Sequence, residues 1–260
     1  MPVSATLKVM SFNLRVDNTG DGINSFTNRF DRVIEVILRE APDIVGFQEV
    51  TDHMRARLRD HIPGYTVQGC GRGQDYHGES MLIAYRSDEV ELIELQNRWL
   101  SPTPSVPGST FGGDQSACPR MYTAALLKHN RIPLPFRLIN THLDHCGAQA
   151  RLLGAMQLVR DISERREYTI LTGDFNATPD AREVKLFTEA LSSRGFADCT
   201  ATLGPTFHGF GRLTPETGAT KIDFIFSDAA CLDAYVVEDV PVNGQYYSDH
   251  NAVCAVLELA

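Results

Sequence analysis

The stretch YTILTGDFN, residues 168–176, decides the fold and contains the first candidate functional residues. Its first part, Tyr168–Gly173, is rich in β-branched and apolar side chains and predicts a buried strand. Asp174 and Asn176 follow at once, so a carboxylate and an amide stand at the end of a rigid element. The same combination of an apolar strand and a polar residue at its end recurs from one end of the chain to the other.

Other apolar segments also predict strands, and several of them end in a polar residue. The segments are Leu7–Asn13, Ile44–Gln48, Ser80–Tyr85, Tyr122–Leu127, Phe136–His142, Lys221–Ser227 and Ala252–Leu259. The polar residues in them or directly beside them are Asn13 (SFNLR), Glu49 (FQEV), His142 (NTHLD), Asp223 (KIDFIF), Asp249 and His250 (SDHNAV). Because loops at one edge of a sheet bring together groups that are distant in sequence, these side chains are candidates for one shared site.

Helical periodicity or helix-start signals mark three further segments. They are a helix whose apolar face is formed by Phe30, Val33, Ile34, Ile37 and Leu38, a helix over Ala148–Glu164, and a helix that follows the N-cap Thr178 with Pro179 in its first position and stops near Gly195. Many strands with few helices predict sheets that pack together and are covered on the outside by helices.

The bulk composition fits a large globular unit, and we expect one domain over residues 1–260. Of the 260 residues, 43% are hydrophobic and 22% are charged, which is enough to bury a large core without the signature of disorder. The net charge of −9 means that the surface as a whole repels polyanions, whereas a long duplex would need a basic face. Arg55, Arg57 and Arg59 are typical of a solvated helix face.

Cysteine usage and hydropathy favour a reducing compartment and no membrane anchor. The six cysteines are scattered and include no C-x-x-C pair, which favours free thiols. The first residues, MPVSATLKVM, lack a basic region followed by a long apolar stretch. No apolar run approaches the ~20 residues of a membrane span. We therefore expect a cytoplasmic protein, and nothing in the sequence indicates an obligate protein partner.

The polar residue types suit metal-assisted phosphoryl transfer. Carboxylates together with an amide oxygen are hard ligands that match Mg²⁺, with Mn²⁺ as the expected substitute. Zn²⁺ fits less well, because no H-x-x-x-H or Cys/His cluster appears in the sequence. Two imidazoles can transfer protons, and each needs a carboxylate to fix its tautomer. Asp223 is available for His250, and Glu79, in HGESM, is available for His142.

With these motifs in order, the sequence resembles the endonuclease/exonuclease/phosphatase superfamily, which includes DNase I-like nucleases, CCR4-type deadenylases, neutral sphingomyelinases and inositol-polyphosphate phosphatases. The resemblance runs from SFNLR to SDHNAV and so covers nearly the whole chain. It implies an α+β fold, a four-layer α/β/β/α sandwich of two mixed, mostly antiparallel sheets. The segments WLSPTPSVPGS and ACPRMYTAALL resemble a bacterial subgroup that is loosely called CCR4-like.

The resemblance also implies roles for particular residues. Glu49 would be the principal metal ligand, with Asn13 and Asp249 completing the metal and phosphate site. His250, oriented by Asp223, would be the general base that activates the attacking water.

The other residues of the pattern would surround the phosphate group. His142, paired with Glu79, would stabilise the phosphate charge or assist the leaving oxygen. Asp174 and Asn176 would hold the nucleophile and a phosphoryl oxygen. Arg120, in CPRMY, matches a phosphate-contacting arginine of DNase-like members.

Structural roles compete with each functional assignment, since a strand-end amide, a helix-capping acid, an Asx turn or a core histidine would give the same residue types. The joint occurrence of the motifs in family order favours the site. For Asp144, His145 and Arg151, a place in the pocket and a place outside it both remain open. Trp99 and Phe207 are interpreted as packing residues in preference to base-stacking platforms.

The residues indicate the reaction class but leave the substrate open. The first candidate is a phosphodiesterase or nuclease of CCR4-like type that acts on short or single-stranded nucleic acid. The alternative is a phosphatase or sphingomyelinase-like phospholipase C that acts on a small or lipid phosphate ester. GDFNAT departs from the GDxNYR-type motif of inositol-polyphosphate phosphatases, which disfavours that branch. A non-catalytic binding domain on the same fold is a third hypothesis, and the intact residue set argues against it.

Overall fold

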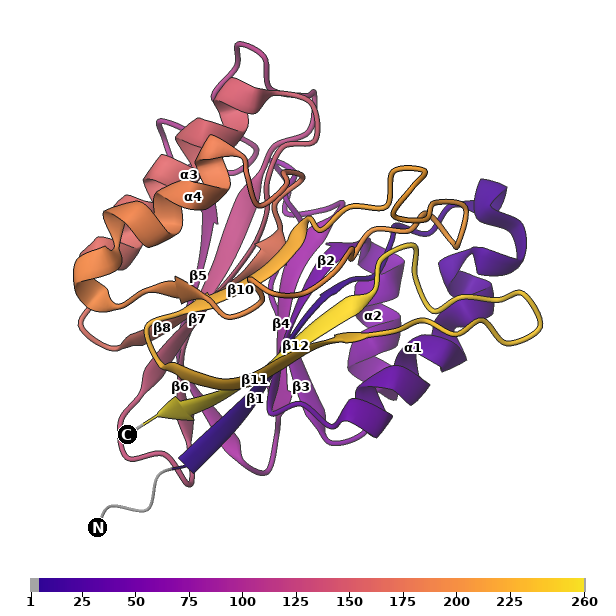
Figure 1. Cartoon of the computed structure of the whole chain (residues 1–260), viewed down its shortest axis with the longest axis horizontal. Coiled ribbons are helices and arrows are strands. Elements are labelled where there is room, and N and C mark those ends of the chain that lie inside the picture. The colour runs from indigo at the N-terminus through magenta and orange to yellow at the C-terminus, as the bar shows by residue number, and fades with distance from the viewer. Residues whose placement is uncertain (1–4, 260) are drawn as a thin grey trace.

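The computed structural model describes residues 5–259, which form two six-stranded sheets packed face to face with helices outside them (Figure 1). Across the first sheet the order is β11 (Ala230–Val237), β12 (Ala252–Leu259), β1 (Ala5–Asn13), β2 (Ile44–Val50), β4 (Ser80–Arg86) and β3 (Tyr65–Gln68). Across the second sheet it is β5 (Val90–Trp99), β6 (Met121–His129), β7 (Phe136–His142), β8 (Tyr168–Asp174), β10 (Asp223–Ser227) and β9 (Ala197–Asp198). The helices are α1 (Phe26–Glu40), α2 (Asp52–His61), α3 (Ala148–Ser163) and α4 (Arg182–Ala190), with short 3₁₀ helices η1 (Thr19–Asn24) and η2 (Ser192–Arg194).

The two sheets are built alike and are mostly antiparallel. Each contains one parallel pair, β1 with β2 and β7 with β8, and each pair is joined through a helix. An antiparallel strand lies beside each pair, β12 next to β1 and β10 next to β8. Helices α1 and α2 cover the first sheet, and α3 and α4 cover the second (Figure 1). The α/β/β/α sandwich expected from the sequence is therefore confirmed.

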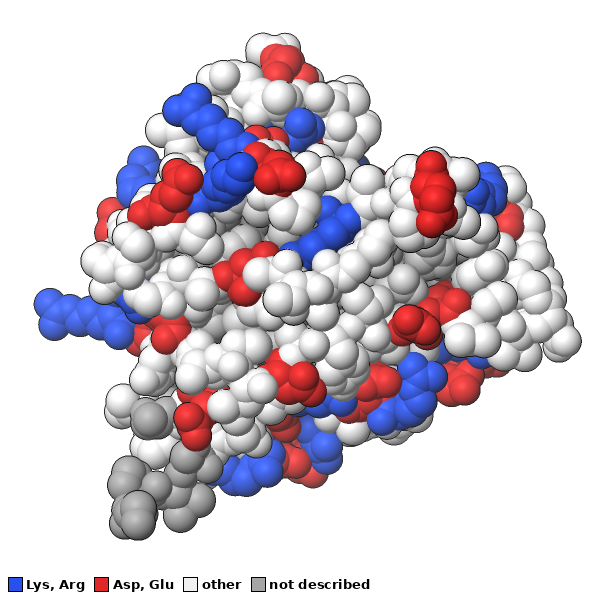
Figure 2. Space-filling model, viewed as in Figure 1, with Lys and Arg blue, Asp and Glu red and all other residues white. Residues whose placement is uncertain are grey.

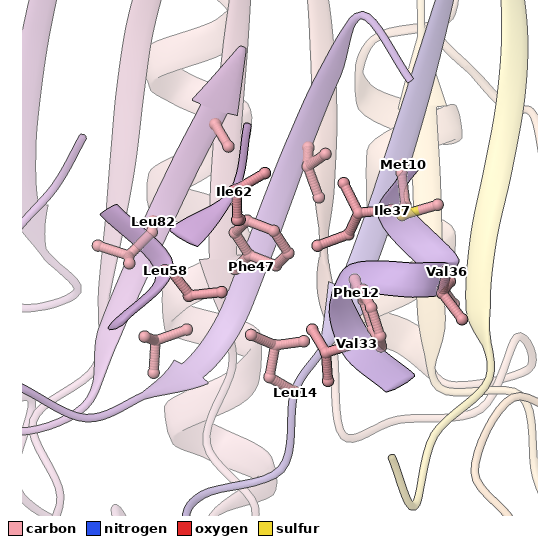
Figure 3. Close-up of a cluster of buried hydrophobic side chains, with 14 of the residues drawn as sticks. Met10, Phe12, Leu14, Val33, Val36, Ile37, Phe47, Leu58, Ile62 and Leu82 are labelled. Carbon is pink, nitrogen blue, oxygen red and sulfur yellow. The ribbon is translucent and has the colours of Figure 1, made fainter. Parts of the chain in front are cut away.

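Alternation along the strands divides the core into layers. In β1, Leu7 and Val9 are buried between the two sheets, whereas Met10 and Phe12 join the cluster under α1. Figure 3 shows the side chains of this outer cluster gathered between the helix and the strands. Full burial of each large apolar side chain contributes roughly 1.5–3 kcal/mol, so the layers hold the strand ends in fixed positions.

Helix α1 is tied to the end of β1 by a buried arginine. Phe30, Val33 and Ile37 are buried on its apolar face and Ile34 is partly buried against the same cluster, as the periodicity predicts. The prediction is wrong for Leu38, which is 46% exposed. On the same helix, Arg29 is fully buried and donates to the backbone oxygen of Leu14 at 2.5 Å and of Tyr247 at 2.6 Å. These bonds join the segments that follow Asn13 and precede Asp249, so they help to position both.

A buried polar bridge connects the two sheets beneath their shared end. Asn140 of β7 donates to the backbone oxygens of Phe47 at 2.8 Å and Leu82 at 2.9 Å, which lie in the other sheet. Gln48 donates to Asn140 Oδ1 at 2.7 Å. Gly46 leaves the space for this approach, because a Cβ there would overlap the side chains of Asn140 and Thr172. The bridge fixes one sheet relative to the other.

The structure corrects parts of the expected secondary structure. Strands β3, β5, β9 and β11 are present but were not predicted. The predicted start of the third helix is wrong, because Thr178 accepts a turn hydrogen bond from the Ala181 amide and α4 begins at Arg182. Its expected end is also wrong, since α4 ends at Ala190 and the separate 3₁₀ helix η2 leads to Gly195, which adopts φ = 73°. The solvated helix expected around Arg57 is α2. Within residues 5–259, no helix is both long and apolar enough to cross a membrane.

Candidate active site

Three of the predicted site residues form one row across the second sheet. His142 ends β7 and is in register with Asp174, which ends β8. Asp174 is in turn in register with Asp223, the first residue of β10. Asn176 lies two residues after Asp174, in a left-handed conformation with φ = 48°. This conformation turns the chain and allows the backbone N–H of Asn176 to donate to Asp174 Oδ1 at 2.8 Å.

The first sheet brings its predicted residues to the same place. Asn13 ends β1 and donates through Nδ2 to Glu49 Oε1 at 3.1 Å and to Asp174 Oδ2 at 2.9 Å. Glu49 lies in β2 with φ = 62°, at a point where the pairing with β4 shifts register. Asp249 and His250 lie just before β12 and are separated from it by Asn251. The ends of both sheets therefore meet at one cluster of polar side chains.

His250 and Asp223 form the pair expected from the sequence. The distance from His250 Nδ1 to Asp223 Oδ2 is 2.8 Å, and Thr206 Oγ1 also donates to Asp223 Oδ2 at 2.6 Å. Burial alone would lower the pKa of His250, but Asp223 and the neighbouring Asp174 and Asp249 carboxylates raise it to about 10. The other ring nitrogen of His250, Nε2, lies 3.8 Å from Asp174 Oδ2.

Phe207 packs against the imidazole of His250, with their ring centroids 4.9 Å apart. The predicted packing role of Phe207 thus applies to a catalytic candidate. Trp99 is buried as predicted, and its indole N–H donates to the backbone oxygen of Arg72 at 2.7 Å.

Buried carboxylates are concentrated around this pair. Burial raises the pKa of Asp174 and of Asp249, and in each case a nearby carboxylate adds to the effect. Burial acts in the same direction on Glu49, but the charge of His250 and the Val16 amide, which donates to Glu49 Oε2 at 2.8 Å, lower its pKa. Asp223 Oδ1 is buried without a hydrogen-bond partner among residues 5–259. The cluster thus carries more acceptors than the protein donors satisfy.

The partner expected for His142 is wrong. The Glu79 carboxylate accepts from Arg72 Nη2 at 2.6 Å, whereas His142 Nε2 lies 2.8 Å from Asn176 Nδ2 and 3.4 Å from Asp174 Oδ2. His142 Nδ1 is buried and has no hydrogen-bond partner in the described part of the chain. Burial, followed by the charges of Arg120 and Arg72, places the pKa of His142 well below its ordinary value, so the ring is neutral.

The contacts of Asn13 differ from those of a metal ligand. Its amide oxygen accepts a hydrogen bond from the Arg15 backbone amide at 2.8 Å, so the NH₂ group faces the carboxylates of Glu49 and Asp174. In this arrangement Asn13 holds two acidic groups from different sheets together. The expectation that Asn13 binds the metal directly is therefore not supported by the geometry.

A cavity of about 270 Å³ opens beside the cluster. Its lining includes both the expected site residues and further charged side chains: Glu49, His142, Asn176, Glu79, Arg120, Arg72, Arg15 and His145. The expected site residue Arg120 is therefore present. Arg72 and Arg15 were missed by sequence reasoning, and the only signal for Arg72 is its position between two glycines in CGRGQ, seven residues before Glu79.

The structure also separates the residues whose place was left open. His145 lines the cavity and its Nδ1 lies 2.7 Å from Arg120 Nη2. Asp144 lies behind it, where its carboxylate contacts Arg120 Nε at 3.3 Å and accepts from the Gly147 amide at 2.7 Å. Arg151 supports this turn through the Asp144 backbone oxygen at 3.1 Å.

A two-sheet sandwich with buried carboxylates and two histidines at one end defines a phosphoesterase of DNase I-like fold. The chain belongs to the endonuclease/exonuclease/phosphatase family, whose sequence model matches residues 10–250. It is accordingly a hydrolase of phosphate esters. Assignment to the CCR4-like subgroup stays a prediction.

Solved structures of similar proteins agree with membership of the endonuclease/exonuclease/phosphatase family. The chain is similar to an endonuclease/exonuclease/phosphatase from Bacteroides vulgatus, with 32% identity, a TM-score of 0.90, and 98% of this chain and 100% of that chain covered. It is also similar to the mannosyl-6-phosphatase Bt3783 of Bacteroides thetaiotaomicron, with 26% identity, a TM-score of 0.84, and the same coverage of 98% and 100%. D. rerio TDP2, solved with a single-strand DNA product, shares 17% identity with a TM-score of 0.74 over 97% of this chain and 98% of that chain, which shows the fold alone.

Proposed function

We propose that this protein is a divalent-cation-dependent phosphatase or phosphodiesterase for the phosphate ester of a small polar molecule, with His250 as the general base. The observation that carries the proposal is the buried pair of His250 and Asp223, 2.8 Å apart, beside the carboxylates of Glu49, Asp174 and Asp249. A general base next to several carboxylates, which are hard ligands for a divalent cation, suits metal-assisted attack of water on a phosphate.

The side chains fit a divalent cation. Glu49, His142 and Asp174 have ligand atoms within 4.8 Å of one another, as do Asp174, Asp223 and His250. Burial raises the pKa of Asp174 and Asp249, and the charge of a neighbouring carboxylate (Asp223 and Glu49, respectively) raises it further, so a bound cation would offset the cost of keeping these groups ionised. Carboxylate oxygens are the preferred ligands of Mg²⁺, and Mn²⁺ accepts the same set.

We assign the cation to Glu49 and Asp249, because these carboxylates are close enough for the charge of Glu49 to raise the pKa of Asp249, and Asn13 holds Glu49 in place. A cation there would supply positive charge to the phosphate oxygens. The same charge matters for His250, because a general base must be unprotonated at the working pH and its pKa is raised to about 10 by nearby carboxylates. The proposal therefore requires that their negative charge be neutralised before His250 can accept a proton.

The chain's own residues divide the remaining work. Asp223 accepts a hydrogen bond from His250 Nδ1–H, which leaves Nε2 as the atom that takes a proton from the attacking water. Neutral His142 can donate from Nδ1 to a phosphoryl or leaving oxygen, since Nε2 faces the Asn176 amide. Asp174, which lies between the two histidines, orients the water.

Three observations support a small substrate in preference to a long nucleic acid. The cavity measures about 270 Å³. The net charge is −9, and on the face shown in Figure 2 lysines and arginines are interspersed with acidic residues, without an extended basic groove. The similar protein from Bacteroides thetaiotaomicron is a mannosyl-6-phosphatase.

The test is a substrate panel with purified protein in Mg²⁺, in Mn²⁺ and in excess EDTA. The panel contains sugar phosphates, p-nitrophenyl phosphate, a single-stranded RNA, a single-stranded DNA and sphingomyelin vesicles. We expect metal-dependent release of phosphate from the small esters and at least ~10²-fold less activity in His250→Ala, the usual effect of losing a general base. Faster cleavage of either oligonucleotide than of every small ester would support the nuclease first expected from the sequence and reject this substrate class.

A further inference from the structure

Two arginines that line the cavity are held in place but retain unused donors. Arg72 and Arg120 are at least nine-tenths buried, with exposed fractions of 9% and 4%. Both line the cavity beside Glu49 and His142. The Nη1 atom of each arginine is buried without a hydrogen-bond partner among residues 5–259. An unmade hydrogen bond on a buried charged donor is costly, so a ligand that accepts from both would be favoured.

The position of Arg72 is set by its own loop. Its Nη2 donates to Glu79 Oε1 at 2.6 Å, and its backbone amide donates to the Glu79 backbone oxygen at 2.9 Å. Its backbone oxygen accepts from the Trp99 indole at 2.7 Å. At Gly71, any Cβ would overlap the His77 backbone, so the loop closes tightly. Arg72 is therefore presented to the cavity by a preformed turn.

The position of Arg120 is set by the turn that contains Asp144 and His145. Its Nε lies 3.3 Å from Asp144 Oδ2, and its Nη2 lies 2.7 Å from His145 Nδ1. Asp144 is fixed in turn by the amides of Cys146 at 3.0 Å and Gly147 at 2.7 Å. In each guanidinium group, therefore, Nη2 has a fixed partner and Nη1 is an unused donor.

The number of terminal oxygens on a phosphate ester decides whether it can accept hydrogen bonds from both arginines. A phosphate monoester has three terminal oxygens and a charge near −2 at neutral pH, whereas a diester has two terminal oxygens and a charge of −1. If the cation side of the cavity takes one oxygen, a monoester still offers one to each arginine. A diester offers only one, and its second ester group must occupy the space beside the other arginine.

We propose that Arg72, together with Arg120, makes the site selective for phosphate monoesters over diesters. This inference rests on the proposed phosphoesterase function and adds the class of ester to it. Arg72 is the specificity-determining residue, and Glu79 positions it.

The variants must avoid leaving a buried carboxylate alone. Arg72→Met would strand Glu79, so the main variant is the double substitution Arg72→Met/Glu79→Gln, which removes both charges together. Arg72→Lys retains the charge but loses the fork of donors. The control is Arg137→Met, because Arg137 is buried, with 3% exposed, and has an unpartnered Nη1, but lies near the other end of β7. It leaves Glu167 without its 2.6 Å partner, so a loss of stability from an unpaired carboxylate is seen in the control as well.

The first measurement compares kcat/KM for p-nitrophenyl phosphate with that for bis-p-nitrophenyl phosphate in Mg²⁺. We expect the wild-type protein to prefer the monoester, and the double variant to lose at least tenfold of that preference, mainly through slower monoester hydrolysis. Arg72→Lys should fall between them, and Arg137→Met should keep the wild-type ratio even if it is less stable. Equal losses on both substrates, or a wild-type preference for the diester, would overturn the proposal.

The second measurement is calorimetric binding of inorganic phosphate in the presence of Mg²⁺, which does not depend on turnover. The double variant should bind phosphate at least tenfold more weakly than either the wild type or Arg137→Met. Phosphate binding that depends on Arg72 without hydrolysis of any ester would reject the proposed function but retain the arginine pair. Unchanged phosphate affinity in the double variant would reject the arginine pair, whatever the activity.

Discussion

The Asn176 amide nitrogen lies 2.8 Å from His142 Nε2 and also donates to the Leu143 backbone oxygen at 3.1 Å. The second contact identifies the NH₂ side of the amide, so Nε2 accepts and the proton of the neutral ring is on Nδ1. The Nδ1–H donor thus lies next to the cavity, on the residue that the family resemblance assigned to stabilising the phosphate charge or assisting the leaving oxygen.

We expect histidine NMR of the metal-free protein to show His142 neutral at pH 7 with its proton on Nδ1. Burial and the charges of Arg120 and Arg72 keep the pKa of His142 well below its ordinary value, so the ring should remain neutral on acidification through pH 6.5. In Asn176→Ala the preference for the Nδ1 tautomer should weaken. A proton on Nε2 in the wild-type protein would contradict the assignment.

Replacing Glu49 with Gln should weaken Mg²⁺ binding by at least ~10-fold and lower kcat by at least ~10²-fold, because a neutral amide is a poorer ligand for a hard cation. Calorimetry with Mg²⁺ measures the first effect and steady-state kinetics the second. Gln can retain one acceptor for Asn13 or Val16, so the fold should survive, as circular dichroism would show. The control is Glu167→Gln, which changes a carboxylate just before β8 that does not line the cavity. Unchanged Mg²⁺ affinity in Glu49→Gln would reject Glu49 as a ligand.

Gly46→Ala should destabilise the fold by about 1–3 kcal/mol, the usual range for overpacking a core. The added Cβ would overlap Thr172 and Asn140 at the bridge between the sheets. Gly204→Ala is the matched control, because a Cβ there meets no atom within 4 Å. Urea unfolding at pH 7 measures both. Similar stabilities of the two variants would mean that the two sheets do not approach closely enough at Gly46 to exclude a Cβ.

Asp239 provides a prediction about pH. Burial raises its pKa to about 6, although the amides of Ser248 and Tyr247 and the charge of Arg32 act in the opposite direction. Because the folded state then binds a proton more tightly than the unfolded state, the contribution of Asp239 to stability is present at low pH and is lost as pH rises through about 6. Asp239→Asn removes this dependence, so relative to wild type it should gain stability between pH 4.5 and pH 7.

The comparison requires free energies of unfolding at both pH values for the wild type and Asp239→Asn. Glu238→Gln, at the exposed neighbouring position, is the control and should follow the wild type. A stability difference between wild type and Asp239→Asn that stays constant from pH 4.5 to pH 7 would mean that Asp239 titrates normally.

The strands that sequence reasoning found and missed differ in their place in the sheets. All eight expected strands exist, and the four that were missed, β3, β5, β9 and β11, are the edges of the two sheets. An inner strand is covered on both faces and therefore shows a nearly continuous apolar run. Edge strands such as β5, VELIELQNRW, have polar residues at many positions and lack that pattern.

The site divides in the same way between what local sequence specifies and what it does not. Residues at strand ends, such as Asp174 and His250, could be predicted because the strands themselves fix where those ends meet. Partners contributed by loops could not, since Glu79 was assigned to His142 but pairs with Arg72, seven residues earlier in the same turn. Similarly, no pattern in the sequence indicates that the Asn13 oxygen is taken by the Arg15 amide.

The last prediction concerns the pair of His250 and Asp223. His250→Ala should lower kcat by at least ~10²-fold. Asp223→Asn should also cause a large loss, because an amide no longer holds the Nδ1 proton as a carboxylate does, and Nε2 then ceases to be the reliable acceptor. In metal-free protein, the same substitution should lower the pKa of His250 from about 10, since Asp223 is the largest cause that raises it.

If the two residues act as one unit, the double variant should be little slower than His250→Ala alone, because the function of Asp223 is lost once the imidazole is absent. The control cycle pairs Asp223→Asn with His142→Ala, whose ring contacts Asn176 and Asp174 and makes no hydrogen bond to Asp223, so those two effects should be much closer to additive than those of His250→Ala and Asp223→Asn. Both cycles are measured as kcat at saturating Mg²⁺ and substrate. Additive losses for His250→Ala and Asp223→Asn would show that the 2.8 Å contact has no catalytic part, and the base would then have to be Asp174, which lies between the two histidines.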